Sequence, residues 1–481
     1  MSITCALIGQ VDSGKSSLAG QLIYLCGGIR EAAIAQIRRE ADLYALWRYP
    51  IEYAWVMDSI KESRERGISI DITTRHIKTD SDIDCALFDT PGHLSYRKNG
   101  FAGLSTADAA IIVVSAIELE YLSFHLNSAY AFGIRQLIVC VNKMDERTVD
   151  FSEDSFQSAR LKISLLLLDA GFDPDTVVFI PISAVRGDNI RELSMRMPWW
   201  PQVAREDNEE ASPLTLLQAI GRLQPPTSHR ERMRNRPLHI PIQNVYVNSK
   251  WSEDEGGRCV VVGSIVSGVV KQGSILYVSV CRREKSRKED EEVIVELLVE
   301  SIQIQDQSVE QAGVGDHVGL RLHSTNFASR LLKRGAVLCG EFGHHHQSSF
   351  VSGKRWTEKF WAKVQVVNRT GKRNIRAGYA PELFVHTAHV PCRWQKLQSR
   401  ISEIGEVLEE EPAELGVGEW GIVEMVPLRP LCVGSVEECP ALGRIVVTDH
   451  RMVVAVGEVL GTQEAKNSGE RTKGALKKVY S

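Results

Sequence analysis

Apolar and polar positions in the first 200 residues alternate in a way that predicts an α/β sheet. Near-continuous runs of Val, Ile, Leu and Ala stand at 3–8, 85–88, 109–114, 137–142 and 177–182. Runs of this kind are typical of strands buried on both faces of a parallel sheet. Apolar residues in 155–170 (SFQSARLKISLLLLDA) have helical spacing instead. We therefore expect an open α/β sheet with helices between its strands.

From about residue 237 the pattern changes to short Val- and Ile-rich runs between Gly, Asn and Ser turns. HIPIQNVYV (239–247) and HVGLRL (317–322) are examples, and a second block of this texture runs from about 357 to 460. Such texture predicts antiparallel β-barrels. We expect an α/β domain over 1–230, one barrel over 237–342 and another over 350–460, with a disordered basic tail over 461–481.

Length and composition narrow the class of protein. A chain of 481 residues is too long for one core, and its net charge of -4 indicates no particular partner. Ten cysteines occur without any C-x-x-C pair, which is typical of free thiols in a reducing cytoplasm. The first apolar run is too short for a signal peptide, and no run reaches the length of a membrane span. We expect a cytoplasmic protein without membrane contact.

The segment GQVDSGKSS (9–17) lies between an apolar run and a helical stretch, and its spacing of Gly9, Gly14, Lys15 and Ser16 fits a phosphate-binding loop. Glycines let backbone N–H groups approach phosphates, and the next helix N-terminus favours negative charge. Lys15 would contact the β- and γ-phosphates, and the Ser16 hydroxyl would bind Mg²⁺. The predicted nucleotide-binding residues of this loop are Asp12, Ser13, Gly14, Lys15, Ser16 and Ser17.

A second motif, DTPGH (89–93), closes the run CALF. Asp89 stands at a predicted strand end, where it can hold Mg²⁺ through water. The N–H of Gly92 can report whether a γ-phosphate is present.

Motifs at two further strand ends predict which nucleotide base is bound. In NKMD (142–145), Asn142, Lys143 and Asp145 suit guanine, because a carboxylate accepts from the base N1–H and 2-amino group that adenine lacks. In ISAVRGDN (182–189), Ser183 and Ala184 can offer backbone N–H groups to the guanine O6. Four motifs in this order favour GTP and GDP over an ATP-dependent kinase or a glycine-rich turn without a ligand.

With these motifs in place, the chain resembles translational GTPases of the elongation factor 1-alpha family over nearly its whole length. The resemblance is carried by GQVDSGKSS, DTPGH and RQLIVCVNKMD (135–145), by YAWVMDSIKESRERGISIDI (53–72) and RPLHIPIQNVY (236–246), and by GYAPELFVHTAHVPCRW (378–394) and CPALGRIVVTDHRMVVAVG (439–457). It implies a P-loop GTPase domain followed by two antiparallel β-barrels.

The resemblance also implies a function. A GTP-bound member delivers aminoacyl-tRNA to the ribosomal A site, the ribosome stimulates hydrolysis, and the GDP form releases its cargo. His93 matches the histidine that orients the attacking water, so it is the expected catalytic residue. Ser69 stands where the family usually has Thr, and its hydroxyl keeps a Mg²⁺ contact feasible. We expect a monomer that uses a guanine-nucleotide exchange factor.

Several departures lie where the cargo of the family binds. The usual Gly-Arg-Val-Glu-x-Gly reads Gly263-Ser264-Ile265-Val266-Ser267-Gly268, and Gln303 stands in place of a Glu. Residues 403–419 hold seven Glu and no Lys or Arg, where the family is basic, and carboxylates repel RNA.

These departures leave other readings open besides an elongation factor. One is a termination or ribosome-rescue GTPase whose cargo is a tRNA-shaped protein. Others are the GTPase subunit of a sulfate adenylyltransferase and a GTP-binding regulator without a ribosomal role. We expect aminoacyl-tRNA delivery, with the protein cargo as the alternative.

Overall fold

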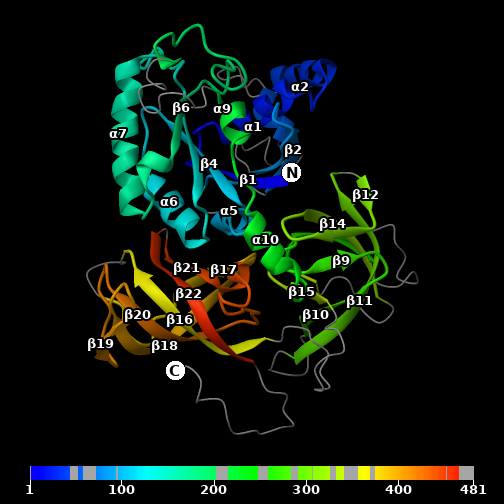
Figure 1. Ribbon diagram of the computed structural model, residues 1–481, viewed down its shortest axis with the longest axis vertical. Coiled ribbons are helices and arrows are strands. Elements are labelled where there is room, and N and C mark those ends of the chain that lie inside the picture. The colour runs from blue at the N-terminus through cyan, green and yellow to red at the C-terminus, as the bar shows by residue number, and fades with distance from the viewer. Residues whose placement is uncertain are drawn as a thin grey trace.

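The computed structural model consists of an α/β domain and two β-barrels that lie side by side beneath it in the view of Figure 1. It describes residues 2–43, 52–57, 72–93, 96–201, 215–247, 258–282, 291–305, 307–324, 332–340, 356–368, 374–450 and 452–464. Ser69 and residues 465–481 of the predicted tail therefore lie outside the described residues.

The α/β domain is built on a six-stranded sheet in the order β2-β3-β1-β4-β5-β6. Its strands are β1 (Ser2–Ile8), β2 (Thr73–Lys78), β3 (Asp84–Asp89), β4 (Ala109–Ser115), β5 (Gln136–Asn142) and β6 (Val178–Pro181). All neighbours are parallel except β2, which pairs antiparallel with β3. The five apolar runs are thus strands, and the fully buried burial pattern of β4 explains its unbroken run AAIIVVS.

Helices connect these strands and lie around the sheet (Figure 1). They are α1 (Lys15–Leu25), α2 (Glu31–Leu43), α3 (Glu52–Met57), α5 (Arg97–Leu104), α6 (Leu122–Ala131), α7 (Glu153–Asp169), the short 3₁₀ helix η2 (Pro174–Thr176), α9 (Leu216–Ile220) and α10 (Thr227–Arg234). The stretch with helical spacing is α7, whose N-cap Ser152 accepts a hydrogen bond from the backbone N–H of Ser155. α10 forms within the predicted polar joint 224–236.

The second domain is a six-stranded antiparallel barrel that closes through pairing of β10 with β11, and β12 extends its sheet. Its strands are β7 (His239–Tyr246), β8 (Cys259–Ser264), β9 (Val269–Lys271), β10 (Ile275–Arg282), β11 (Glu291–Ile304), β12 (Gln307–Val309), β13 (Gln311–Gly313), β14 (His317–His323) and β15 (Val337–Gly340). β9 and β13 form a separate two-stranded sheet.

The third domain is a barrel of the same kind, closed by pairing of β17 with β18 and extended by β19. It contains β16 (Thr357–Val366), β17 (Glu382–Val385), β18 (Ala388–Ile401), β19 (Val407–Glu410), β20 (Trp420–Pro427), β21 (Arg444–Asp449) and β22 (Met452–Glu464), with the short helix α11 (Pro440–Gly443). The fold class predicted from the sequence is confirmed.

The predicted end of the last barrel at residue 460 is four residues early. β22 continues to Glu464, which pairs with Thr357 of β16. The polar composition of 461–464 suggested a tail, but an antiparallel partner strand supplies the backbone hydrogen bonds that hold these residues in the sheet.

The α/β domain and the third domain share a continuous apolar core. Phe384, Val446, Val453 and Val456 of the third domain belong to the same buried cluster as the α/β sheet. The Phe384 ring packs edge-on against Phe101 of α5, with ring centroids 4.7 Å apart. The second domain has its own core, and polar pairs such as Arg334–Asn99 connect it to the α/β domain.

Candidate nucleotide-binding site

The four motifs meet at one edge of the α/β sheet. β1, β3, β5 and β6 run parallel to one another in the sheet, so their carboxyl ends point the same way. The phosphate loop follows β1, DTPGH closes and follows β3, NKMD closes and follows β5, and ISAVRGDN follows β6. This is where ligands bind in open α/β sheets.

The phosphate loop needs glycine at two positions. Gly9 has φ of 147°, and a Cβ there would lie 2.2 Å from the carbonyl oxygen of Val113. Gly14 is left-handed with φ of 96°, and its Cβ would lie 2.3 Å from Nδ2 of Asn142. Both positions therefore exclude side chains, and the loop backbone stays close to the neighbouring strand ends.

Lys15 is buried at the start of α1, where its side chain turns back over the loop. Its Nζ donates to the carbonyl oxygens of Gly9 at 2.9 Å and Gln10 at 2.6 Å. Burial lowers the pKa of Lys15 to about 8, against the opposing effect of Asp89 and Asp12. The side chain remains largely protonated at neutral pH and presents a concentrated positive charge, as phosphate binding requires.

Asp89 and Ser16 form the part of the site that suits a divalent cation. Burial raises the pKa of Asp89 to about 6, although a hydrogen bond with Ser16 and the charge of Lys15 oppose the rise. Oδ1 of Asp89 is buried and accepts no hydrogen bond within the described part of the chain. A buried carboxylate oxygen next to a hydroxyl is a donor set that fits Mg²⁺.

Gly92 packs directly against the phosphate loop. A Cβ on Gly92 would lie 2.4 Å from Nζ of Lys15 and 2.9 Å from the carbonyl group of Gln10. His93 follows on the exposed side of the turn, with its ring 5.9 Å from that of Tyr96. The predicted γ-phosphate turn therefore lies beside the lysine of the loop, and the predicted catalytic histidine is the next residue along the chain.

His125 of α6 is a site residue to which sequence reasoning assigned no role. It lines a small cavity together with Gly92, His93 and Phe124. Burial lowers the pKa of His125 to about 3, and Lys15 adds to the effect. Its buried Nε2 has no hydrogen-bond partner in the described structure, so a neutral imidazole faces the γ-phosphate turn. A single histidine inside a helix carries no sequence signal that separates this position from an ordinary core residue.

Asn142 connects three loops of the site. Its Nδ2 donates to the carbonyl oxygen of Ser13 at 2.7 Å, and its Oδ1 accepts from the backbone N–H of Ala184 at 2.9 Å. The side chain is buried and holds the phosphate loop and the loop after β6 in place. The N–H of Ala184 that was predicted to face O6 is thus engaged by Asn142, and its contact with guanine stays a prediction.

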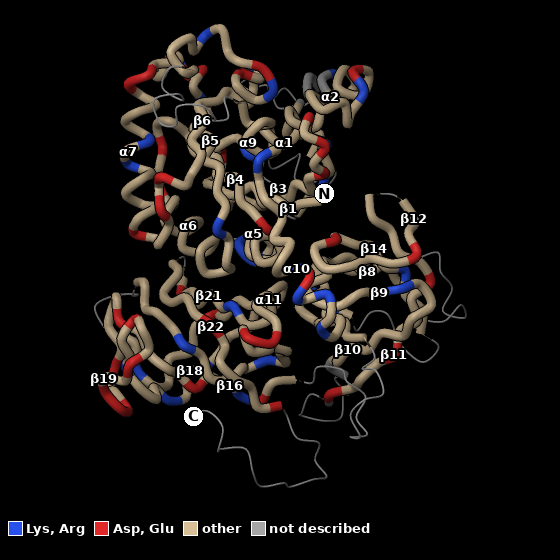
Figure 2. Tube along the Cα trace, in the orientation of Figure 1, with Lys and Arg blue, Asp and Glu red and all other residues tan. Residues whose placement is uncertain are grey.

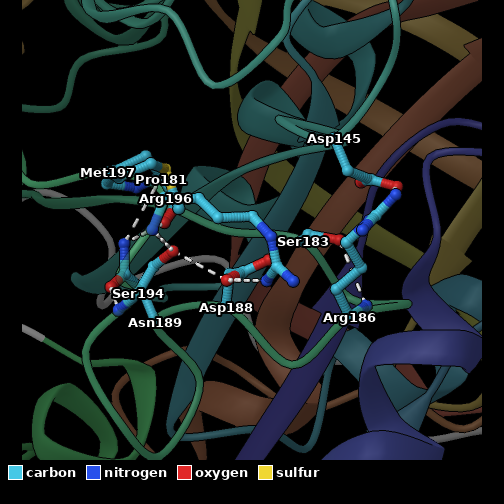
Figure 3. Close-up of polar contacts among 9 residues, drawn as sticks. All are labelled: Asp145, Pro181, Ser183, Arg186, Asp188, Asn189, Ser194, Arg196 and Met197. Carbon is cyan, nitrogen blue, oxygen red and sulfur yellow. Dashed lines mark hydrogen bonds and ion pairs between the residues drawn. The ribbon is translucent and has the colours of Figure 1, made fainter.

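Asp145 lies at the rim of the site next to a residue that the sequence analysis did not single out. Arg186 approaches the carboxylate, with Nε 3.7 Å from Oδ2 of Asp145 (Figure 3). The backbone N–H of Arg186 donates to Oγ of Ser183 at 3.2 Å. The same loop is held by Asp188, which accepts from Ser194 at 2.7 Å and from Arg196 at 3.1 Å. The loop that carries Ser183 and Ala184 is therefore braced from both sides.

The remaining predicted residues of the nucleotide site lie in the same loops. Asp12 and Lys143 both adopt positive φ, of 60° and 62°. Ser13 is buried, whereas Ser17 is half-buried in the first turn of α1. The structure brings together every predicted nucleotide residue except Ser69, which lies outside the described residues.

Two barrel residues that depart from the family pattern, Ser264 and Gln303, lie in different surroundings. Ser264 lies 3.1 Å from the ring Nδ1 of His317 at the interface with the α/β domain, and Gln303 is exposed on β11. Burial lowers the pKa of His317 to about 4. Its ring lies 5.1 Å from Phe88 of β3.

Four of the seven glutamates of residues 403–419 form ion pairs with three basic residues of the same barrel. Arg400 pairs with Glu409 at 3.1 Å and with Glu419 at 3.4 Å. Glu414 pairs with Arg376 at 2.7 Å, and Glu411 pairs with Lys396. The acidic character of this segment is therefore weaker than its sequence suggests.

Comparisons with known proteins agree with this arrangement. Residues 1–226 match the family described as the elongation factor Tu GTP binding domain, and residues 359–460 match the GTP-eEF1A C-terminal domain-like family. An elongation factor 1-alpha, oocyte form, of Xenopus laevis is 36% identical over 99% of this chain and 98% of its own length.

Two solved structures have the same fold. The Ski7 GTPase-like domain of S. cerevisiae, bound to GDP and inorganic phosphate, has a TM-score of 0.71 at 15% identity, over 95% of this chain and 97% of that chain. Elongation factor SelB of Methanococcus maripaludis has a TM-score of 0.62 at 17% identity, over 95% and 78%.

The guanine-nucleotide site on an α/β domain, the two barrels that follow it and the full-length similarity to an elongation factor together identify a translational GTPase. Such proteins bind GTP and hydrolyse it in association with the ribosome. The identity to elongation factor 1-alpha spans almost the whole of both chains, and the chain belongs to the elongation factor 1-alpha family. No helix in the described ranges is long and apolar enough to cross a membrane.

Proposed function

We propose that this protein carries aminoacyl-tRNA to the ribosomal A site while GTP is bound and releases it after hydrolysis. The observation that carries the proposal is a basic cluster where the three domains meet. Lys98 is exposed on α5, and Arg97 beside it pairs with Glu382 of β17. Arg334 of the second domain donates to Asn99 of α5.

The third domain borders this cluster through Glu382 and His389, which lie 3.1 Å apart. Burial lowers the pKa of His389, the charges of Lys98 and Arg97 add to the effect, and Glu382 opposes it. Lys and Arg positions lie on α5 and on α10 in the Cα trace (Figure 2). The positive charges of Lys98 and Arg334, from the first and second domains, suit the phosphates of one end of a tRNA, because nucleic-acid affinity depends on phosphate neutralisation.

The internal ion pairs of residues 403–419 support the same proposal. Glutamates that already pair with Arg400, Arg376 and Lys396 repel an approaching RNA less than free carboxylates would. At the cargo site of the second domain, Gln303 is exposed and retains hydrogen-bonding capacity for a tRNA end.

For hydrolysis, Lys15 and the backbone donors of residues 12–17 hold the phosphates and stabilise charge on the transferring phosphoryl group. Asp145 binds the base edge, while Asn142 keeps the loops in register. Ser16, Asp89 and Ser69 would hold Mg²⁺, which neutralises phosphate charge when it is bound. His93 positions the attacking water.

We also infer the surroundings in which this cycle operates. Burial and the hydrogen bonds of the phosphate loop favour slow nucleotide release, so an exchange factor restores the GTP form. The protein acts in the cytoplasm as a monomer. The location and the monomeric state are both inferred from its membership of the elongation factor 1-alpha family.

The test uses protein loaded with a non-hydrolysable GTP analogue, and it measures binding to aminoacyl-tRNA and to deacylated tRNA at two salt concentrations. We expect preference for the aminoacyl form and weaker binding at higher salt. Lys98→Ala should weaken binding about tenfold and reduce the salt slope by about one, because one phosphate contact is lost. Lys162→Ala on the outer side of α7 is the matched control and should bind as the parent does.

A tRNA-shaped protein cargo is the alternative, and it is favoured by the exposed surface at β19. Ile404 and Leu408 are exposed there beside Glu406 and Glu410, neither of which makes an ion pair within the described residues. An acidic and apolar surface suits a basic protein better than RNA. Binding without any preference for aminoacyl-tRNA, in protein that still binds the GTP analogue, would contradict tRNA delivery and favour this alternative.

A further inference from the structure

A cavity lies between the helix α10 and the second domain, away from the nucleotide loops. Its volume of about 320 Å³ falls at the lower end of the range of about 300–1,000 Å³ that is usual for ligand pockets. One wall is α10, and the other consists of β9, β13 and the residues that follow β13. Figure 1 shows α10 beside β9, below the α/β domain. Because Glu231, Arg234 and Gln311 of the lining are exposed, the cavity is accessible from solvent.

α10 is held by both domains that it connects, so the cavity is preformed. Nη1 of Arg230 donates to the carbonyl oxygen of Ser2 at 2.9 Å, and Nη2 donates to Oδ2 of Asp108 at 2.6 Å. Ser2 begins β1 and Asp108 precedes β4, on the edge of the sheet opposite the nucleotide loops. In the second domain, the backbone N–H of Gly268 donates to the carbonyl oxygen of Met233 at 2.9 Å. A ligand in the cavity would therefore leave the nucleotide site accessible.

Two arginines of the lining have hydrogen-bond donors that no acceptor occupies in the described part of the chain. Arg230 and Arg234 are four residues apart, so they lie on the same face of α10. Nε of Arg230 is buried and has no hydrogen-bond partner among the described residues. Arg234 is exposed and forms no ion pair within the described ranges. A free guanidinium beside a buried donor suits a carboxylate, because its N–H groups match the two carboxylate oxygens.

The electrostatic field around α10 is positive beyond these two residues. The helix holds three arginines and one glutamate. Burial lowers the pKa of His229, and the charges of Arg232, Arg444 and Arg230 add to the effect, while that of Asp108 opposes it. A field of this sign attracts a negatively charged ligand.

The rest of the lining favours a single carboxylate over a run of phosphates. Glu231 and Asp316 also line the cavity, and their charges repel a ligand that carries several negative groups. Val269, Ala312 and Val314 supply apolar surface that a nucleic-acid backbone would leave unused. The lining therefore suits one carboxylate with an apolar side chain next to it, as a peptide presents them, better than it suits RNA.

We propose that the cavity between α10 and β13 binds a short segment of a partner protein in which one Asp or Glu stands next to a Val, Leu or Ile. The carboxylate binds Arg234 and the unpaired Nε of Arg230, and the apolar side chain packs against Val269 and Val314. The proposal does not depend on which cargo the barrels carry, because its residues are separate from those of the nucleotide site and of the proposed tRNA site.

The experiment selects binders from a phage-displayed library of random peptides on the full-length protein. We expect an enriched consensus with one Asp or Glu beside a Val, Leu or Ile. The enriched peptide, labelled with a fluorophore for anisotropy, should bind the parent with a micromolar Kd, and Arg234→Glu should weaken this binding at least tenfold.

Arg232→Glu is the matched control. It places the same substitution at an exposed arginine of the same helix that is not among the lining residues of the cavity. At about 0.15 M salt, where exposed charges are screened, it should bind the peptide within about threefold of the parent. Unchanged GDP affinity and unchanged thermal unfolding of each variant verify that it is folded.

A second peptide, with its Asp or Glu replaced by Asn or Gln, tests the carboxylate and should lose as much affinity as Arg234→Glu does. A selection without a consensus, a consensus without an acid, or an unchanged Kd for Arg234→Glu would overturn the proposal. Equal losses for Arg234→Glu and Arg232→Glu would also overturn it. A short single-stranded oligouridylate provides the remaining arm, since displacement of the peptide by this RNA would identify α10 as a surface for polyanions instead.

Discussion

At the scale of single residues, Asp89 shows how burial and charge oppose each other in this site. Burial raises the pKa of its carboxyl group to about 6 from an ordinary 3.8. The folded protein therefore binds this proton more readily than the unfolded chain does. The resulting contribution to stability is present below about pH 4 and is lost as the pH rises through 6.

Replacing Asp89 with Asn removes the unfavourable free energy of burying a charged carboxylate. In buffer with a chelator, Asp89→Asn should raise the free energy of unfolding by about 2 kcal/mol at pH 7.5 and by much less at pH 4.5. Denaturant unfolding of parent and variant at both pH values measures the two differences. An equal difference at both would mean that the carboxylate is not penalised by burial.

At the scale of elements, the site depends on loops from separate strands that one side chain holds together. Asn142, at the end of β5, bonds to the loop after β1 through Ser13 and to the loop after β6 through Ala184. These two hydrogen bonds of the Asn142 side chain connect the phosphate loop to the base-binding loops. The relative positions of the nucleotide-binding loops are therefore set by a residue that need not touch the nucleotide.

Asn142→Ala should accordingly affect both binding and stability. Loss of two buried hydrogen bonds should lower the free energy of unfolding by about 2–3 kcal/mol and weaken GDP binding at least tenfold. Thermal unfolding and titration with fluorescent GDP measure these effects. Arg196→Ala is a useful comparison. It removes one half-exposed contact with Asp188 in the loop after β6 and should change GDP affinity little.

The sequence was informative about elements whose position follows from chain order. Unbroken apolar runs located five strands, and motifs at the strand ends located Lys15, Asp89 and Asn142, because parallel strands place their carboxyl ends together. β2, with its half-exposed sequence TTRHIK, has no comparable run and escaped prediction.

Contacts between distant residues could not be predicted in this way. The pairing of Arg400 with Glu409 and Glu419 depends on strand register in the third domain. The approach of Arg186 to Asp145 depends on how the loop after β6 folds back. The cavity that joins His125 to Gly92 and His93 requires α6 and the loop after β3 to be adjacent. None of these distances is encoded in a local pattern.

At the scale of the whole molecule, the predicted catalytic histidine lies on a surface that another body can contact. His93 is exposed on the turn after β3, beside a small cavity that His125 also lines. A partner that binds this surface can orient the imidazole towards the attacking water. Hydrolysis should thus be slow in isolation and fast on the ribosome.

His93→Ala tests this directly. The variant should bind GTP nearly as the parent does, because the exposed His93 ring lies outside the buried phosphate loop, but its ribosome-stimulated turnover should fall at least a hundredfold. Single-turnover hydrolysis with and without ribosomes gives both rates. Full stimulation of the variant would remove His93 from the mechanism.

The apolar core that the α/β domain shares with the third domain also constrains how the protein can change over generations. A substitution at Phe101 or Phe384 alters packing in both domains, so neither surface can diverge without a compensating change in the other. The second domain has a core of its own and meets the α/β domain through polar pairs. We therefore expect substitutions to be tolerated more readily where the second barrel meets the α/β domain than at the packed contact between Phe101 and Phe384.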